Sequence, residues 1–285
     1  MLDWRFIEKE TLLSRGDIIL FWRILKRDWF LNINNNRGKY CILFFLIIIM
    51  TIINIQLLNR NNGNILDLFY MTYKDTEYKN SNLDFQEFPF IWFLINILIS
   101  SSIGNYILED IKKDAYYVLI RCKTYTLYWL SKICFVLIHT LLIYFILFSL
   151  TFIIGAIFLN NTLEWSLLFN PILRESIVQS ITPLKFILSL FLIYSTTSIV
   201  ITLLQINLSL FLGKKRGVIL IIFILVLSIF STNQYLPAIH SMLLKHDIFD
   251  KAHGLSIIDS LKYNFFLSIL LIFIGYKILT KKDIS

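Results

Sequence analysis

Six long apolar runs divide this sequence and leave the chain few ways to fold. They cover residues 40–58, 88–108, 133–159, 184–212, 218–231 and 265–279. A helix needs about 20 apolar residues to cross a bilayer core of roughly 30 Å, and the first four runs are long enough. The last two are short, so they need flanking residues or partial re-entry. Because backbone polar groups must be satisfied inside a membrane, the runs predict an all-α integral membrane protein with six transmembrane helices.

Composition supports this prediction and excludes other classes. Hydrophobic residues make up 57% of the 285 residues and charged residues 16%, against about 45–50% and 25% in soluble domains. Cys41 and Cys134 lie in apolar runs and Cys122 lies in a basic loop, so no disulfide framework is expected. We therefore expect a single membrane domain over residues 1–285, neither disordered nor stapled by disulfides.

The distribution of Lys and Arg predicts the orientation in the membrane. With the amino terminus inside, 19 of the 27 basic residues fall on the cytoplasmic side, whereas the 19 acidic residues divide almost evenly. The positive-inside rule then places both termini in the cytoplasm of a multi-pass protein of the cell membrane. This orientation explains the formal charge of +8 better than a nucleic-acid partner does. The first apolar run follows 39 residues of mixed charge, so we expect no cleavable signal peptide.

The cytoplasmic segment 1–39 contains an amphipathic stretch at 17–31. Its apolar side chains recur at helical spacing, and cations fall on or beside the opposite face. The apolar face comprises Ile18, Phe21, Trp22, Leu25 and Trp29, and the cations are Arg23, Lys26 and Arg27. This pattern predicts a helix lying in the membrane interface. It serves either as an anchor before the first span or as part of a docking surface for a cytoplasmic partner.

A second amphipathic stretch lies in the cytoplasmic segment 109–132, where we expect a helix over 109–126. This segment is longer than a connection requires, so it indicates partner binding, with interfacial packing as the alternative. Ile111, Ala115, Val118, Leu119 and Cys122 form its helical stripe, and the first four of these are expected contact residues. On the outer side, segment 232–264 predicts short re-entrant helices around a turn at Gly254.

The fourth apolar run carries a polar seam with steps of three and four residues. The seam consists of Ser195, Ser198, Thr202, Gln205 and Ser209. Such a stripe faces other helices or a hydrated path, since lipid cannot satisfy it. Two interpretations remain open: polar packing between helices, or the lining of a substrate route.

Residues with catalytic or metal-binding chemistry are scarce. His139 is the ionisable residue nearest a bilayer centre, and a packing role is expected for it. His246, Asp250 and His253 share one helical face and could hold zinc, although a solvated face is the favoured interpretation. The basic loop 213–217 lacks the Walker A pattern. We therefore expect no enzyme activity, metal or cofactor in this chain.

The layout and the stretch 108–119, continued by Tyr125, Tyr128 and Lys132, resemble the type 2 permeases of ABC transporters. In that family an acidic residue ends the second span, a Leu-rich turn follows, and a Lys opens the third span. Glu109, Leu119 and Lys132 occupy these places, whereas Asp114-Ala115 replaces the family's Gly-Thr. The resemblance implies a permease half that dimerises with a second permease subunit and sits on partner ABC ATPase subunits.

ATP and Mg would then bind the partner ATPase, and segment 109–126 would seat in it. The resemblance adds Glu109 and Lys132 to the expected contact residues. Weakly polar spans favour export of a hydrophobic or amphiphilic substrate, such as a peptide, a drug or a lipid-like molecule. The alternatives are a stand-alone membrane immunity or scaffold protein without transport activity and, third, a membrane enzyme.

Overall fold

A computed structural model of the chain describes residues 15–60, 63–75, 88–113, 118–119, 124–159, 162–165, 182–249 and 254–281. The α-helices are α1 (Arg15–Asn59), α2 (Ile65–Tyr73), α3 (Phe90–Lys113), α5 (Tyr125–Phe158), α7 (Pro183–Leu212), α8 (Lys214–Phe230) and α9 (Ile257–Lys281). Two 3₁₀ helices, η2 (Pro237–Ser241) and η3 (Leu243–Lys245), precede α9. The described residues form no strand, only one isolated bridge between His246 and Leu255. The all-α prediction is confirmed.

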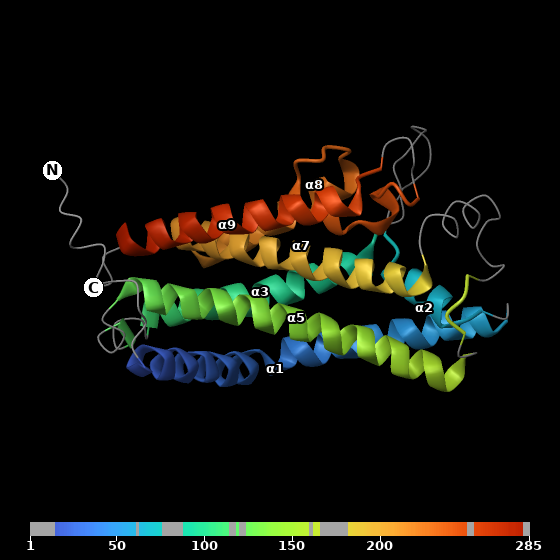
Figure 1. Cartoon of the computed structure of the whole chain (residues 1–285), viewed down its shortest axis with the longest axis horizontal. Coiled ribbons are helices and arrows are strands. Elements are labelled where there is room, and N and C mark those ends of the chain that lie inside the picture. Colours follow the sequence, from blue (N-terminus) through green and yellow to red (C-terminus); the bar gives the residue numbers. More distant parts are fainter. Residues whose placement is uncertain are drawn as a thin grey trace.

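The long helices lie side by side along the long axis of the molecule (Figure 1). α7 is central, because it packs against α3, α5, α8 and α9, while α1 packs against α3 and α5. α1 begins at the left end of Figure 1, where α3 and α9 end and α5 begins. We call this the amino-terminal end of the bundle. α2 lies at the opposite end.

Among the described residues, five helices, α1, α3, α5, α7 and α9, are long and apolar enough to cross a membrane. Large apolar side chains cover the outside of the bundle, including Phe145, Ile153, Phe211 and Phe266. Such a surface suits hydrocarbon rather than water. α8 has 17 residues, or about 26 Å of helix at 1.5 Å per residue, and so falls short of the bilayer core.

α1 corrects the predicted interface helix. The stretch 17–31 and the first span form one 45-residue helix with a kink at Asn36 (φ −118°, ψ 18°), and both parts run along the bundle (Figure 1). The buried face also differs from the predicted one, since Leu25 is buried but Ile18 and Trp22 are exposed, and Phe21 and Trp29 are half-buried. The reason is that Asp28 turns inward, where it pairs with Lys132 of α5 and accepts a hydrogen bond from Tyr106 of α3.

The single helix expected over 109–126 is also corrected. Residues 109–113 belong to the end of α3, and α5 already begins at Tyr125. Thr124 caps α5, because its hydroxyl accepts a hydrogen bond from Leu127 N at 3.4 Å. Val118 and Leu119 are helical, while Ala115 and Cys122 lie outside the described residues. The two long helices therefore continue as stems on either side of the connection 114–123.

At the opposite end, α2 was not expected. A capping box starts it: Asp67 N donates to Asn64 Oδ1 at 3.1 Å, and Asn64 N donates to Asp67 Oδ2 at 2.9 Å. In segment 232–264 the short helix η2 packs against α7, α8 and α9, and η3 packs against η2. The last long helix begins at Ile257, eight residues before the predicted run.

Candidate functional site: an ionic cluster joining α1, α3 and α5

The stems on either side of the connection 114–123 are joined by an ion pair. Asp110 lies in the last turn of α3 and Lys132 lies near the start of α5. Lys132 Nζ is 2.6 Å from Asp110 Oδ2, and both side chains are almost completely buried. The antiparallel neighbours α3 and α5 are thereby locked together at the amino-terminal end of the bundle.

α1 contributes a second carboxylate to this pair. Asp28 Oδ2 accepts from Lys132 Nζ at 2.7 Å. Arg27 Nη2 contacts Asp28 Oδ1 at 2.9 Å and Asp110 Oδ1 at 2.6 Å. Two cations therefore neutralise two carboxylates. We call Arg27, Asp28, Tyr106, Asp110, Tyr128 and Lys132 the ionic cluster.

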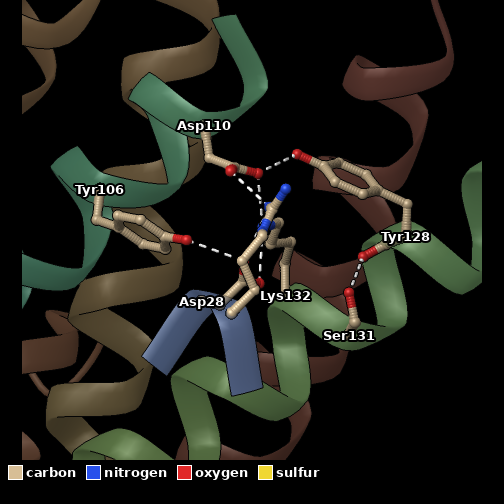
Figure 2. Close-up of polar contacts among 7 residues, drawn as sticks. Asp28, Tyr106, Asp110, Tyr128, Ser131 and Lys132 are labelled. Carbon is tan, nitrogen blue, oxygen red and sulfur yellow. Dashed lines mark hydrogen bonds and ion pairs between the residues drawn. The ribbon is translucent and has the colours of Figure 1, made fainter. Parts of the chain in front are cut away.

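Two tyrosines complete the hydrogen bonding of the ionic cluster (Figure 2). Tyr106 donates to Asp28 Oδ1 at 2.9 Å, and Tyr128 donates to Asp110 Oδ2 at 2.8 Å. Both aromatic rings lie beside the Lys132 ammonium, with centroids at 5.7 and 5.0 Å. Buried charges need such pairing, because an isolated ion in a low-dielectric interior carries a large desolvation penalty.

A polar stripe on α1 extends from the cluster at four-residue spacing: Asp28, Asn32, Asn36 and Tyr40. It meets His139 of α5, whose Nε2 lies 2.8 Å from Tyr40 Oη and 3.1 Å from Asn32 Nδ2. Asn36 Nδ2 donates to Asn32 O and to Ser102 O of α3, each at 3.2 Å. The stripe therefore holds α1 on both neighbours at its kink. His139 is therefore tied to α1 through Nε2, while its Nδ1 is buried without a hydrogen-bond partner.

α8 joins the same end of the bundle through an exposed ion pair between Lys214 and Glu109. The turn between α7 and α8 depends on Gly213, whose φ of 94° favours glycine. Lys39 of α1 also donates to Ser101 O of α3 at 2.9 Å. At this end α1, α3, α5 and α8 are linked by polar contacts.

The predicted partner-contact residues have different fates. Glu109 is exposed and pairs with Lys214, whereas Ile111 and Lys132 are buried. The buried acidic partner of Lys132 is Asp110, not Glu109. Val118 and Leu119 are half-buried and pack against the core, so they are the described apolar side chains of this set that keep some exposed surface at the connection. Among the predicted interface cations, Arg23 and Lys26 are exposed, and Arg27 belongs to the ionic cluster.

The polar seam of α7 is a packing interface in this conformation. All five side chains, Ser195, Ser198, Thr202, Gln205 and Ser209, are buried. Ser198 donates to Asn96 Oδ1 at 2.7 Å and lies 2.6 Å from Tyr144 Oη. Gln205 packs against Gly104, and Ser209 packs against Gly217. Gln205 Nε2 and Ser209 Oγ have no hydrogen-bond partner, so the last part of the seam is polar but unsatisfied.

The predicted zinc face cannot be followed throughout, because Asp250 and His253 lie outside the described residues. His246 is buried, and its Nε2 lies 3.1 Å from Ser260 Oγ. Within the described part of the chain, no three His, Cys, Asp or Glu side chains gather as a metal site.

These helices and the buried ionic cluster define an all-helical, multi-pass membrane protein whose helices are tied together at one end. The chain belongs to the family described as "Protein of unknown function (DUF2705)", which it matches over residues 44–285. This match includes Asp110 and Lys132 and begins after Asp28. No curated protein and no solved structure matches the chain.

Proposed function

We propose that this chain is the membrane permease subunit of an ATP-driven exporter of the ABC type 2 class. The observation that carries the proposal is the Asp110–Lys132 ion pair, which closes the stems of the connection 114–123 and also binds Asp28 of α1. In the proposed orientation both termini and this connection are cytoplasmic. α8 supplies a short fifth crossing, and η2 and η3 form the outer segment before the sixth.

The ionic cluster offers a route for mechanical coupling. A partner that moves the connection also moves the ends of α3 and α5. These ends move together, because separating Asp110 from Lys132 would leave buried charges unpaired at a cost of several kcal/mol. Asp28 carries the displacement to α1, and the kink at Asn36 gives α1 a place to bend. The Glu109–Lys214 pair extends the contact to α8.

The partner is an ABC ATPase subunit, which binds ATP and Mg outside this chain. Val118 and Leu119 are the apolar contacts offered at the connection, and Lys112 and Lys113 are exposed beside them. Trp22, Arg23 and Lys26 are exposed on the amino-terminal part of α1 and flank the docking surface. A second permease subunit completes the transporter.

An apolar groove between α5 and α7 supports a hydrophobic or amphiphilic substrate. Its volume is about 430 Å³. Its lining includes Phe145, Phe148, Phe152, Leu188 and Phe191. Phe145 and Leu188 are largely exposed, so the groove is open on the membrane-facing surface. A molecule dissolved in the bilayer could enter it without crossing water.

Affinity purification from the cell that carries this chain tests the proposal. We expect an ATPase with Walker motifs to co-purify in stoichiometric amount, and its turnover to change when amphiphiles are added. Leu119→Asp should lower the amount of co-purified ATPase at least tenfold while the chain stays in the membrane. Tyr235→Asp at the opposite end is the matched control. If no ATPase accompanies the unaltered chain, a stand-alone scaffold or immunity protein becomes the better account.

A further inference from the structure

Two buried histidines share one serine hydroxyl at the opposite end of the bundle, away from the ionic cluster. His240 lies in η2, His246 follows η3, and Ser260 lies in the first turn of α9. All three side chains are at most 3% exposed. The proposed coupling route does not use them.

The backbone contacts fix the neutral tautomers. His240 Nε2 lies 2.9 Å from Gln234 O, and His246 Nδ1 lies 2.8 Å from Met242 O. A carbonyl oxygen only accepts, so each of these nitrogens carries the hydrogen of its neutral ring. His240 Nδ1 and His246 Nε2 are therefore bare acceptors. Both lie 3.1 Å from Ser260 Oγ.

This arrangement lacks one hydrogen. The Ser260 hydroxyl has a single hydrogen and can donate to only one of the two bare nitrogens. The other nitrogen then faces an oxygen lone pair at hydrogen-bond distance. In a buried site an unsatisfied acceptor carries the full cost of its desolvation.

We infer that His240, Ser260 and His246 form a binding site for one shared proton. A proton on either ring lets that ring donate a hydrogen bond to Ser260 Oγ. The Ser260 hydroxyl then donates its own hydrogen bond to the other ring. Both 3.1 Å contacts become hydrogen bonds. A second proton would place like charges on both rings and leave the hydroxyl hydrogen without an acceptor, so the site holds one proton.

Two opposing effects set the pH at which this proton binds. Burial lowers the pKa of each ring from 6.5 to about 4, because the charged form loses hydration. Completion of the hydrogen-bond chain favours the charged form of the pair. The expected midpoint of the shared proton therefore lies between pH 4 and 6.5.

The surrounding charged and titratable groups act in both directions. Lys245, whose ammonium binds Ser228 O and Ile229 O of α8, disfavours a further positive charge. Asp75 favours it from beyond α2, where it accepts from Leu244 N at 3.1 Å. Asp247 also favours it. On α9, the Asp259 carboxylate favours the added positive charge and its ion-pair partner Lys262 disfavours it, so their effects oppose each other. Tyr263 of α9 stacks on His240 with ring centroids 4.0 Å apart. α3 contributes the neutral Trp92, which donates to Ser241, and no contact of the rings with a charged side chain of α7 is seen among the described residues.

If the proposed orientation holds, the site lies on the outer side and senses external acidity. The placement of the site on the outer side rests on the proposed function. The argument from the number of hydrogens shared by the two rings and Ser260 does not. The proton would bridge the segment of η2 and η3 to the start of α9, and so join the outer segment to the sixth crossing.

Imidazole ¹⁵N spectroscopy on the full chain in lipid nanodiscs tests the inference. The chain has four histidines, so selective labelling gives few signals, and His→Gln variants assign them. At pH 8 we expect His240 as the Nε2–H tautomer and His246 as the Nδ1–H tautomer. A hydrogen on either nitrogen that faces Ser260 would overturn the inference without any acidification.

Titration to pH 4 provides the second readout. We expect both rings to report one shared midpoint and the uptake of a single proton. Ser260→Ala should lower that midpoint by about one pH unit or more, a tenfold weaker proton affinity, while Ser268→Ala on the same helix leaves it unchanged. Two independent one-proton steps, or a midpoint insensitive to Ser260→Ala, would contradict the shared site. Neither outcome bears on whether an ATPase binds the other end.

Discussion

Lys132 Nζ lies 2.6 Å from Asp110 Oδ2, and this contact joins the two helices that hold the connection 114–123. Lys132 lies equally close to Asp28 of α1, at 2.7 Å. One ammonium thus links three helices that are far apart in sequence. Because all three side chains are buried, this link is little screened by salt.

Removal of the Lys132 charge should destabilise the fold strongly. Lys132→Met keeps the aliphatic length but leaves Asp28 and Asp110 with only Arg27 as a cation. We expect a loss of about 3–5 kcal/mol in unfolding free energy, as for other broken buried pairs. Thermal unfolding in detergent measures it. As a control, Lys214→Met removes the exposed partner of Glu109 and should cost at most about 1 kcal/mol of unfolding free energy. Equal losses for the two variants would show that the buried ionic cluster stabilises the fold no more than an exposed ion pair does.

Asn36 should control the kink of α1. Its amide donates to Asn32 O and to Ser102 O, so Asn36→Ala removes the side chain that satisfies the bent backbone and holds α3. We expect faster hydrogen exchange across 32–40 and a stability loss of about 1–2 kcal/mol. Asn35→Ala, at an exposed neighbouring position, is the matched control and should change neither. Unaltered exchange in Asn36→Ala would mean that packing alone sets the bend.

Acidification should lower the unfolding free energy through His240 and His246, because the unfolded chain takes up two protons on these rings whereas the folded site holds one. The pKa of His240 and of His246 is lowered to about 4 by burial, against 6.5 for the free side chain. The unfolded chain therefore takes up protons first as pH falls. The stability present above pH 6.5 is lost as pH falls toward 4, by about 2–4 kcal/mol at pH 5 for the two rings together. Unfolding measured at pH 7.5 and 5 should show a smaller difference in the double variant His240→Gln/His246→Gln than in the unaltered chain; the same difference in both would assign the loss to other groups.

The α7 seam should be closed to water in the conformation described. Ser198 and Thr202 are at most 1% exposed, so cysteines at 198 and 202 should resist membrane-impermeant thiol reagents in the chain alone. A cysteine at exposed Tyr235 should react at once. With the ATPase bound, the proposed transport cycle predicts that ATP changes the reactivity at 198 or 202. Rapid labelling of both positions without any ATPase would contradict the packing that we observe.

The helical class and the five long apolar helices could be predicted from the sequence because long apolar runs have few solutions in a membrane. Lys132 was named from the resemblance to type 2 permeases, in which a Lys opens the third span, and its buried ion pairs were not predicted. Its partners were harder to find. Asp110 stands next to the equally acidic Glu109, and periodicity alone does not tell which of the two turns inward. Asp28 lies one turn after Leu25 on the buried face of α1, but beside the cations Lys26 and Arg27 it looks like part of a solvated face.

Other features depended on tertiary packing. α2 has a sequence signal, the Asn64–Asp67 capping pair before an apolar stretch, although its nine residues are too few for a periodicity argument.

The seam of α7 shows where periodicity stops being informative. It predicted that five polar side chains share a face. All five are buried, but so are most of the residues between them, because α7 is enclosed by its neighbours. Whether that face meets a neighbour or water depends on α3 and α5, which a single helix cannot reveal.

Site-specific photo-cross-linking at the connection tests the central claim most directly. A benzophenone amino acid at position 119, introduced into the chain in its native membrane, should capture an ABC ATPase whose Walker motifs are identified by mass spectrometry. The yield should change when ATP is added, while the same probe at Tyr235 captures no ATPase. The account is contradicted if position 119 yields no ATPase adduct with or without ATP, in membranes where the probe at 235 shows that the labelled chain is present and reactive.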